Sequence, residues 1–284
     1  MRGGAQAHLI ETDDGCFYVV KFQNNPQGGR RILINELIGS LLFDEFEIAT
    51  PEPAFVTVDL DFLQRSPELG VSVGGERLPI PPGQQFGSRY PGTPGVQTIY
   101  DCFPDVLLPQ LCNRDDFFAA MVMDKWLANA DGRQAIFYRG RVPQSNAVAW
   151  TVSMIDHGGL FQGFEWIFRE SPPQGVCCQR AVYGDDPSIR DFELWLDVIA
   201  DMTPEDFEQI YSLIPAEWIG EDAGELRRVL ARLNSRRGRL RALVDESVGY
   251  IRSRNREPWA TDRQRGGKTA AQSTSSPVCA TEVV

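Results

Sequence analysis

The sequence predicts an α+β fold in two lobes, a small β-rich lobe over residues 1–95 and a larger helical lobe over residues 96–254. Three observations predict it. Short runs of β-branched and aromatic residues lie in the first third of the chain. Segments with apolar residues at helical spacing follow. Between them, residues 79–95 are dense in proline and glycine and are expected to hold the hinge.

The first lobe is expected to contain four strands and one helix. Aromatic and β-branched residues at 17–22 follow the turn residues 13–15, which predicts a hairpin with residues 7–10. Apolar residues recur at helical spacing from Ile32 to Phe46, after a polar loop. The expected strands lie at 7–10, 17–22, 54–58 and 86–90, and the expected helix at 32–46.

The second lobe is expected to be mainly helical. One alternating segment, 147–155, predicts a strand that ends in turn residues, and Gly238 is expected to interrupt the last helix. Residues 255–284 lack periodicity and are rich in Ser, Thr, Gly and Gln, so they are predicted to form a disordered tail. The expected helices lie at 115–128, 192–200, 204–213 and 223–251.

Composition and charge exclude several classes of protein. No run approaches the roughly 18 apolar residues of a bilayer span, and the N-terminal residues lack a secretory pattern, so we expect a cytoplasmic protein without a membrane partner. The formal net charge of −11 argues against a general nucleic-acid binder, which has to neutralise phosphates. The six cysteines contain no CxxC pair, and with two histidines they cannot provide a zinc spacing.

Arginines gather between residues 225 and 268, and two interpretations of this segment stay open. It is either a solvated helix face or a surface for an acidic partner. The second interpretation makes the chain a binding protein, but it gives no purpose to Lys21, Asp131 and Asp156.

Four charged residues are candidates for chemistry. Lys21 is one of only three lysines and lies inside an apolar strand, where a buried ammonium needs a partner. Glu36 sits among apolar residues of the following helix, Asp131 follows the helix at 115–128, and Asp156 follows a strand. An edge strand explains Lys21 alone, and turn chemistry explains Asp131 and Asp156 alone. The ordered set, however, matches the phosphotransferase layout of glycine loop, strand lysine, helix glutamate and two loop aspartates.

The chain resembles the HipA-like kinases, and in particular their shorter bacterial branch, over about residues 1–251. An ordered set of short motifs carries the resemblance. They are RGGAQ (2–6), YVVKFQNNPQ (18–27), NE (35–36), FGSR (86–89), DKW (124–126), NADGRQ (129–134) and IDHG (155–158).

The resemblance implies a two-lobed fold related to protein kinases, with ATP and Mg²⁺ as cofactors and a protein substrate phosphorylated on Ser or Thr. The loop that covers the phosphates would contain Gly3 and Gly4. Motif by motif, Lys21 would hold phosphate, Glu36 would orient Lys21, Asp131 would be the catalytic base and Asp156 the metal ligand.

One position departs from the family pattern. The family usually has a metal-binding asparagine five residues after the catalytic aspartate, but here that position is Ile136, which cannot ligate magnesium. Gln134 is an alternative metal ligand through its side-chain carbonyl. Two functions therefore stay open. One is an ATP-dependent phosphotransferase that acts on a hydroxyl of an unidentified protein, and the other is a pseudokinase that binds nucleotide or a protein partner without turnover.

Overall fold

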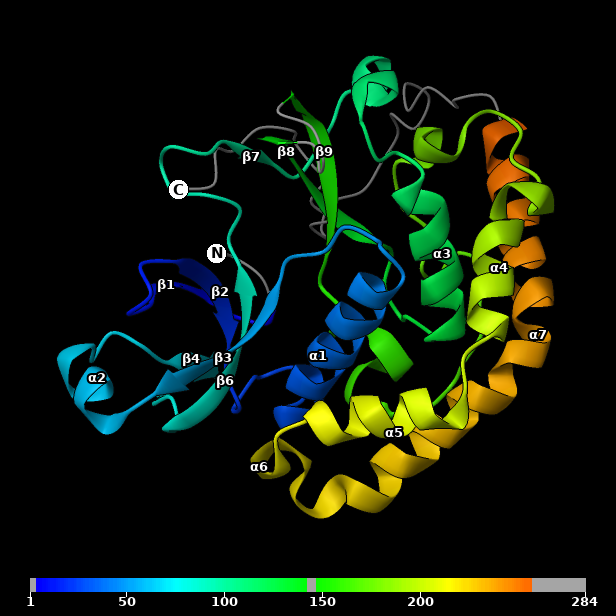
Figure 1. Ribbon diagram of the computed structural model, residues 1–284. Coiled ribbons are helices and arrows are strands. Elements are labelled where there is room, and N and C mark those ends of the chain that lie inside the picture. The colour runs from blue at the N-terminus through cyan, green and yellow to red at the C-terminus, as the bar shows by residue number, and fades with distance from the viewer. Residues whose placement is uncertain (1–3, 142–146, 257–284) are drawn as a thin grey trace, which may run out of the picture.

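The computed structural model describes residues 4–141 and 147–256 and confirms the α+β class (Figure 1). The strands form small antiparallel sheets, most of the helices follow the last strand, and the long helix α7 ends the described residues. The strands are β1 (His8–Glu11), β2 (Phe17–Lys21), β3 (Pro53–Val58), β4 (Val71–Val73), β5 (Glu76–Leu78), β6 (Gly83–Arg89), β7 (Ile99–Tyr100), β8 (Gln134–Arg141) and β9 (Val148–Ile155). The α-helices are α1 (Arg30–Glu45), α2 (Leu60–Arg65), α3 (Asp116–Trp126), α4 (Glu193–Ala200), α5 (Pro204–Leu213), α6 (Ala216–Ile219) and α7 (Ala223–Arg256).

Four strands form the first sheet, in the order β1-β2-β6-β3, with every pair antiparallel. The hairpin β1–β2 and the strand β3 are confirmed where the sequence predicts them. The stretch 79–95 differs from expectation, because β6 occupies much of it and lies in the middle of the sheet. Gly87 allows this close packing, since a Cβ there would lie 2.7 Å from Cγ2 of Val56. The connection after the sheet is thereby limited to residues 90–98.

Helix α1 packs on one face of this sheet and joins it to the rest of the molecule (Figure 1). Its apolar residues share a core with Phe86 of β6 and with the helices that follow. Just after α1, the carbonyl of Ala49 accepts a hydrogen bond of 2.7 Å from the N–H of Met154 in β9. Helix α1 therefore lies between the first sheet and the end of β9.

A second set of contacts joins α1 and the first sheet to the region of α6. Glu217 accepts the backbone N–H of Gln84 at 2.8 Å, and the indole N–H of Trp218 donates to the carbonyl of Gln84 at 2.8 Å. Arg31 donates two hydrogen bonds to the carboxylate of Asp222, at 3.0 and 2.5 Å. Residues 217–222 thus bind the first sheet and the start of α1, although they are distant from both in the sequence.

The later helices form the largest part of the core, with α3 packed against α4 and α7. Helix α7 runs without a break through Gly238, so the expected interruption is wrong. The burial of its apolar residues outweighs the cost of about 1 kcal/mol for a helical glycine. Asn255 and Arg256 also belong to α7, and the rest of the expected tail, 257–284, lies outside the described residues. Within the described ranges, no helix is both long and apolar enough to span a membrane.

A three-stranded sheet, β7-β8-β9, lies beside α3. Its last strand, β9, ends directly before Asp156. Strand β8 has no counterpart among the expected elements, because glutamine, glycine and two arginines dilute its apolar pattern. It pairs with β9 along its whole length, from Gln134 opposite Ile155 to Arg141 opposite Val148. The loop between α3 and β8 is therefore short and runs next to the end of β9.

Candidate functional site

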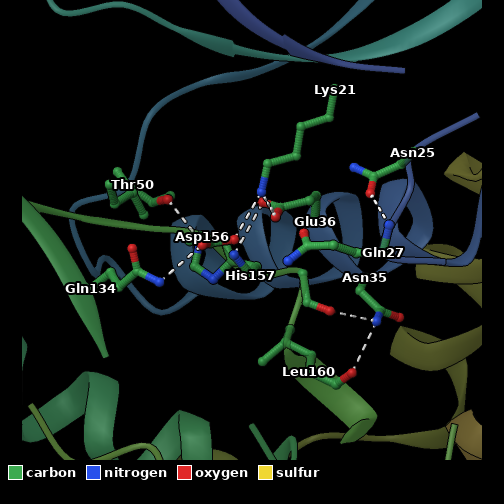
Figure 2. A network of polar contacts seen from close by, with 12 residues as sticks. Lys21, Asn25, Gln27, Asn35, Glu36, Thr50, Gln134, Asp156, His157 and Leu160 are labelled. Carbon is green, nitrogen blue, oxygen red and sulfur yellow. Dashed lines mark hydrogen bonds and ion pairs between the residues drawn. The ribbon is translucent and has the colours of Figure 1, made fainter. Parts of the chain in front are cut away.

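Lys21 lies between two carboxylates that come from distant parts of the sequence (Figure 2). Its Nζ donates to Oε1 of Glu36 in a short contact, and to Oδ1 of Asp156 at 2.8 Å. The other oxygen of Glu36 accepts the backbone N–H of His157 at 3.1 Å. The structure therefore brings together Lys21, Glu36 and Asp156, three of the residues that the sequence predicts for the site.

Each of these side chains is placed by a rigid element. Lys21 is the last residue of β2 and lies opposite Phe86 of the central strand. Glu36 is in the middle of α1, and its side chain is only 2% exposed. Asp156 follows β9 directly and has a φ of 62°, a left-handed conformation that is unfavourable for a residue other than glycine. Strain of this kind tends to persist where the surrounding structure enforces it, which is common at functional sites.

Burial and charge act in opposite directions on these groups. Burial disfavours the ammonium of Lys21, but Glu36 and Asp156 more than offset it, so the pKa of Lys21 lies above its ordinary value. Burial disfavours the charged form of Asp156 too, yet Lys21 lowers the pKa of Asp156 to about 2. Burial raises the pKa of Glu36, which Lys21 and the N–H of His157 only partly counter. Lys21 and Asp156 are therefore charged at neutral pH.

Gln134 holds the second oxygen of Asp156. It is the first residue of β8, and its side-chain N–H donates to Oδ2 of Asp156 at 2.9 Å (Figure 2). Ile136 lies two residues further along the same strand, opposite Ser153, and not in the loop. The position at which the family has an asparagine is therefore taken up by a strand, and Gln134 is the amide that reaches the aspartate.

Asn35 fixes the backbone that follows Asp156. Its side chain is completely buried, and its amide donates to the carbonyls of Gly158, Leu160 and Gly163 at 2.9 to 3.0 Å. Its oxygen accepts the indole N–H of Trp166 at 2.9 Å. One side chain of α1 thus binds three carbonyls of a loop more than 120 residues away, next to Glu36.

Asp131 lies in the loop between α3 and β8, on the same side as the loop after Asp156. A Cβ on Gly159 would lie 2.6 Å from Oδ2 of Asp131 and 2.7 Å from Oδ1 of Asn129, so only glycine fits there. Burial raises the pKa of Asp131, and the negative charge of Asp156 raises it further. Asp131 is therefore close enough to Asp156 for the two charges to interact.

A buried ion pair supports this loop. Arg133 donates to both oxygens of Asp124 on α3, at 2.8 Å from Nε and in a shorter contact from Nη2. Its third hydrogen bond, 2.8 Å long, goes to the carbonyl of Ile155, the residue before Asp156. Asn129 donates to Asp124 at 3.0 Å and accepts the N–H of Asp131 at 3.1 Å. Arg133 thereby links the loop of Asp131 to the start of the loop of Asp156.

Of the two glycines predicted for the phosphate-covering loop, Gly3 lies outside the described residues. Gly4 is in the turn before β1, and a Cβ on it would lie 2.7 Å from the side-chain nitrogen of Gln27. Its backbone therefore approaches the loop between β2 and α1.

The donor set around Asp156 fits a hard divalent cation. Asp156 and Asp131 offer carboxylate oxygens, which Mg²⁺ prefers over nitrogen or sulfur, whereas Gln134 turns its N–H to Asp156 and would have to rotate its amide to offer its oxygen. In the part of the chain that the structure describes, no group of three or more His, Cys, Asp or Glu side chains is arranged to hold a metal. A magnesium ion here would need further ligands from water or phosphate, which is its usual coordination in phosphate-binding sites.

The sequence predicted Lys21, Glu36, Asp131, Asp156 and Gln134 but assigned no role to Asn35, Asp124 or Arg133. A signal was present for Asn35 and Asp124, which are polar residues next to apolar runs, whereas Arg133 stands in a polar turn segment and gives no such signal. Asn35 stands among isoleucines and leucines of α1, and Asp124 follows the apolar run of α3. Their partners are distant in sequence, so only the fold reveals them.

Gly39 sets the distance between α1 and the loop after Asp156. A Cβ on Gly39 would lie 2.5 Å from Cβ of His157 and 2.9 Å from Cδ1 of Leu160. Gly39→Ala is expected to lower the free energy of unfolding by about 1–3 kcal/mol, because overpacking exceeds the gain in helix propensity. Urea denaturation measures the change. Gly238→Ala in α7 is the control, since its Cβ meets nothing within 4 Å, and it should leave stability unchanged or higher. Equal behaviour of the two variants would contradict the close contact.

No protein-family model and no curated protein matches this chain. The assignment of the site therefore depends on the positions and charges of its own residues.

Proposed function

We propose that this chain is an ATP-dependent phosphotransferase with a two-lobed, protein-kinase-like fold related to the HipA-like kinases. The observation that carries the proposal is the ammonium of Lys21, held between Glu36 of a helix and Asp156 of a loop. Protein kinases place a strand lysine against a helix glutamate and a metal-binding aspartate in this way. A purely structural protein has no need of three such charges in one partly buried cluster.

The strand order supports the proposal as well. The lysine strand β2 lies next to the central strand β6, and the helix that directly follows it carries the glutamate. The chain then leaves the sheet through residues 90–98 and reaches α3, which precedes the loop of Asp131. In the proposed enzyme, the first sheet and α1 form the small lobe and the helices form the large lobe.

Each residue has a distinct part in the proposed reaction. Lys21 binds phosphate oxygens of ATP, and Glu36 keeps its ammonium in place. Asp156 and Gln134 would hold Mg²⁺, whose charge offsets that of the β- and γ-phosphates when it is bound. Asp131 accepts the proton of the acceptor hydroxyl, and its raised pKa makes it a better base than an exposed aspartate. The acceptor is a Ser or Thr hydroxyl of a protein substrate.

A pseudokinase is the second candidate, and one observation favours it. Both oxygens of Asp156 already have hydrogen-bond donors, Lys21 on one and Gln134 on the other. The carboxylate is thus satisfied without a metal, and Ile136 supplies no ligand in place of the family's asparagine. A protein of this kind would bind nucleotide or a partner and would not turn ATP over.

Incubation with γ-labelled ATP and Mg²⁺ tests the proposal, with transfer to the protein itself and release of phosphate as the two readouts. The parent protein is expected to show turnover. Asp131→Asn is expected to reduce it by about 100-fold or more, because general base catalysis contributes 10²–10⁴-fold. Its dissociation constant for ATP should stay within about twofold of the parent, since Asp131 acts on the acceptor. Binding of ATP without turnover would favour the pseudokinase, and absence of ATP binding would rule out the phosphotransferase and leave only a pseudokinase that binds a protein partner.

A further inference from the structure

The loop between β2 and α1 is held in one conformation by a buried asparagine. Asn25 is only 4% exposed, and its side-chain oxygen accepts the backbone N–H of Gln27 at 2.8 Å. Its carbonyl accepts the N–H groups of Gly28 and Gly29, at 3.2 and 2.8 Å. These bonds fix the backbone on both sides of Gln27 and so determine where its side chain starts.

A second contact fixes the same loop from the other side. Gly28 has a φ of 156°, and a Cβ on it would lie 2.4 Å from Cβ of Phe164. Phe164 belongs to the segment after Asp156, whose backbone Asn35 holds. The loop of Gln27 is therefore positioned relative to Asp156 as well as to Lys21.

The side chain of Gln27 points from this loop toward the charged cluster. In Figure 2 its amide is directed toward Lys21, Glu36 and Asp156. Its nitrogen also lies under the backbone of Gly4, 2.7 Å from the place of a Cβ on that residue. Although Gln27 is exposed, its amide has no hydrogen-bond partner within residues 4–141 and 147–256. The amide of Gln27 is thus a donor that points toward the cluster from a loop with a hydrogen-bonded backbone.

We infer that Gln27 is a further phosphate-binding residue, which donates its side-chain N–H to the polyphosphate of a nucleoside triphosphate held by Lys21. The inference rests on the proposed function. Phosphate oxygens are acceptors only, so they suit the ammonium of Lys21 and the amide of Gln27. The hydrogen bonds of Asn25 fix the backbone from which this side chain starts, so only the side chain of Gln27 has to become ordered when a ligand binds. Because Gly4 has no side chain, the amide of Gln27 has room beside its backbone.

Nucleotide titrations of Gln27→Ala test this inference, with ATP–Mg²⁺ and AMP as the two probes. A hydrogen bond to a charged group contributes enough that its loss should weaken ATP binding by about 10- to 100-fold. AMP binding should change by less than about twofold, because AMP lacks the phosphates that Gln27 contacts. Gln64→Ala, an exposed glutamine on α2, is the matched control and should bind both nucleotides like the parent.

Gln27→Glu keeps the size of the side chain but places a negative charge beside phosphate. It is expected to weaken ATP binding more than Gln27→Ala does, and circular dichroism should show the parent's fold for both variants. Equal loss of ATP and AMP affinity, or no loss for ATP, would overturn the role of Gln27 while leaving the proposed function intact. If the parent binds neither nucleotide, the proposed function fails, and the inference fails with it.

Discussion

Arg133→Leu is expected to lower the free energy of unfolding by about 3–5 kcal/mol, because it leaves the carboxylate of Asp124 buried without its partner. Both side chains of this ion pair are 0% exposed. The variant also loses the hydrogen bond to the carbonyl of Ile155. Domains are stable by only about 5–15 kcal/mol, so the loss is a large part of the total. Urea denaturation followed by tryptophan fluorescence measures it.

A double variant separates the uncompensated charge from the change in packing. Arg133→Leu with Asp124→Leu removes both charges, and apolar residues often replace a buried ion pair at little cost. The double variant should therefore be more stable than the single variant, although Asn129 loses its acceptor on Asp124. A single variant with the urea midpoint of the parent would show that the pair does not stabilise this loop.

Lys21→Met is expected to abolish ATP binding and to lower the free energy of unfolding by about 3–5 kcal/mol. The methionine has no charge for phosphate, and it leaves Glu36 buried without its cation. Glu36 is 2% exposed, so water cannot replace the lost partner. A thermal-shift titration with Mg-ATP measures binding, and urea denaturation measures stability.

Adding Glu36→Gln to Lys21→Met separates these two effects. Glutamine keeps the size of the side chain and an oxygen for the N–H of His157, and it removes the buried charge. The double variant should recover most of the lost stability but none of the ATP binding. If Lys21→Met binds Mg-ATP as well as the parent, the assignment of Lys21 is incorrect.

The sequence predicted correctly those elements whose own residues show clear alternation or helical spacing. The strand that ends at Lys21 and the helix that carries Glu36 follow from short-range alternation and spacing. Strand β8 could not be predicted in this way, because its polar residues Gln134, Arg139 and Arg141 hide the alternation. It forms a strand because β9 offers it a full set of backbone partners. The central place of β6 likewise depends on pairing with two other strands.

The candidate site likewise contains residues that the sequence could predict and residues whose role depends on partners distant in the sequence. Lys21, Glu36, Asp131 and Asp156 could be predicted as a set because their order in the chain is itself informative. The groups that hold them in place could not, since Asn35 binds carbonyls more than 120 residues away. The sequence named Gln134 as an alternative to Ile136, but its contact with Asp156 depends on the start of β8, where Gln134 pairs with Ile155 directly before Asp156.

The contacts of α6 have a consequence for the exchange of ligands. If β6 moves away from the helices, the hydrogen bonds of Gln84 with Glu217 and Trp218 break. The ion pair between Arg31 and Asp222 breaks as well if α1 moves with the sheet. Opening is then a concerted event, which is slower than the independent motion of single loops. For the nucleotide that we propose at Lys21, we therefore expect the residence time to depend in part on a helix of four residues that supplies none of the charges of the cluster.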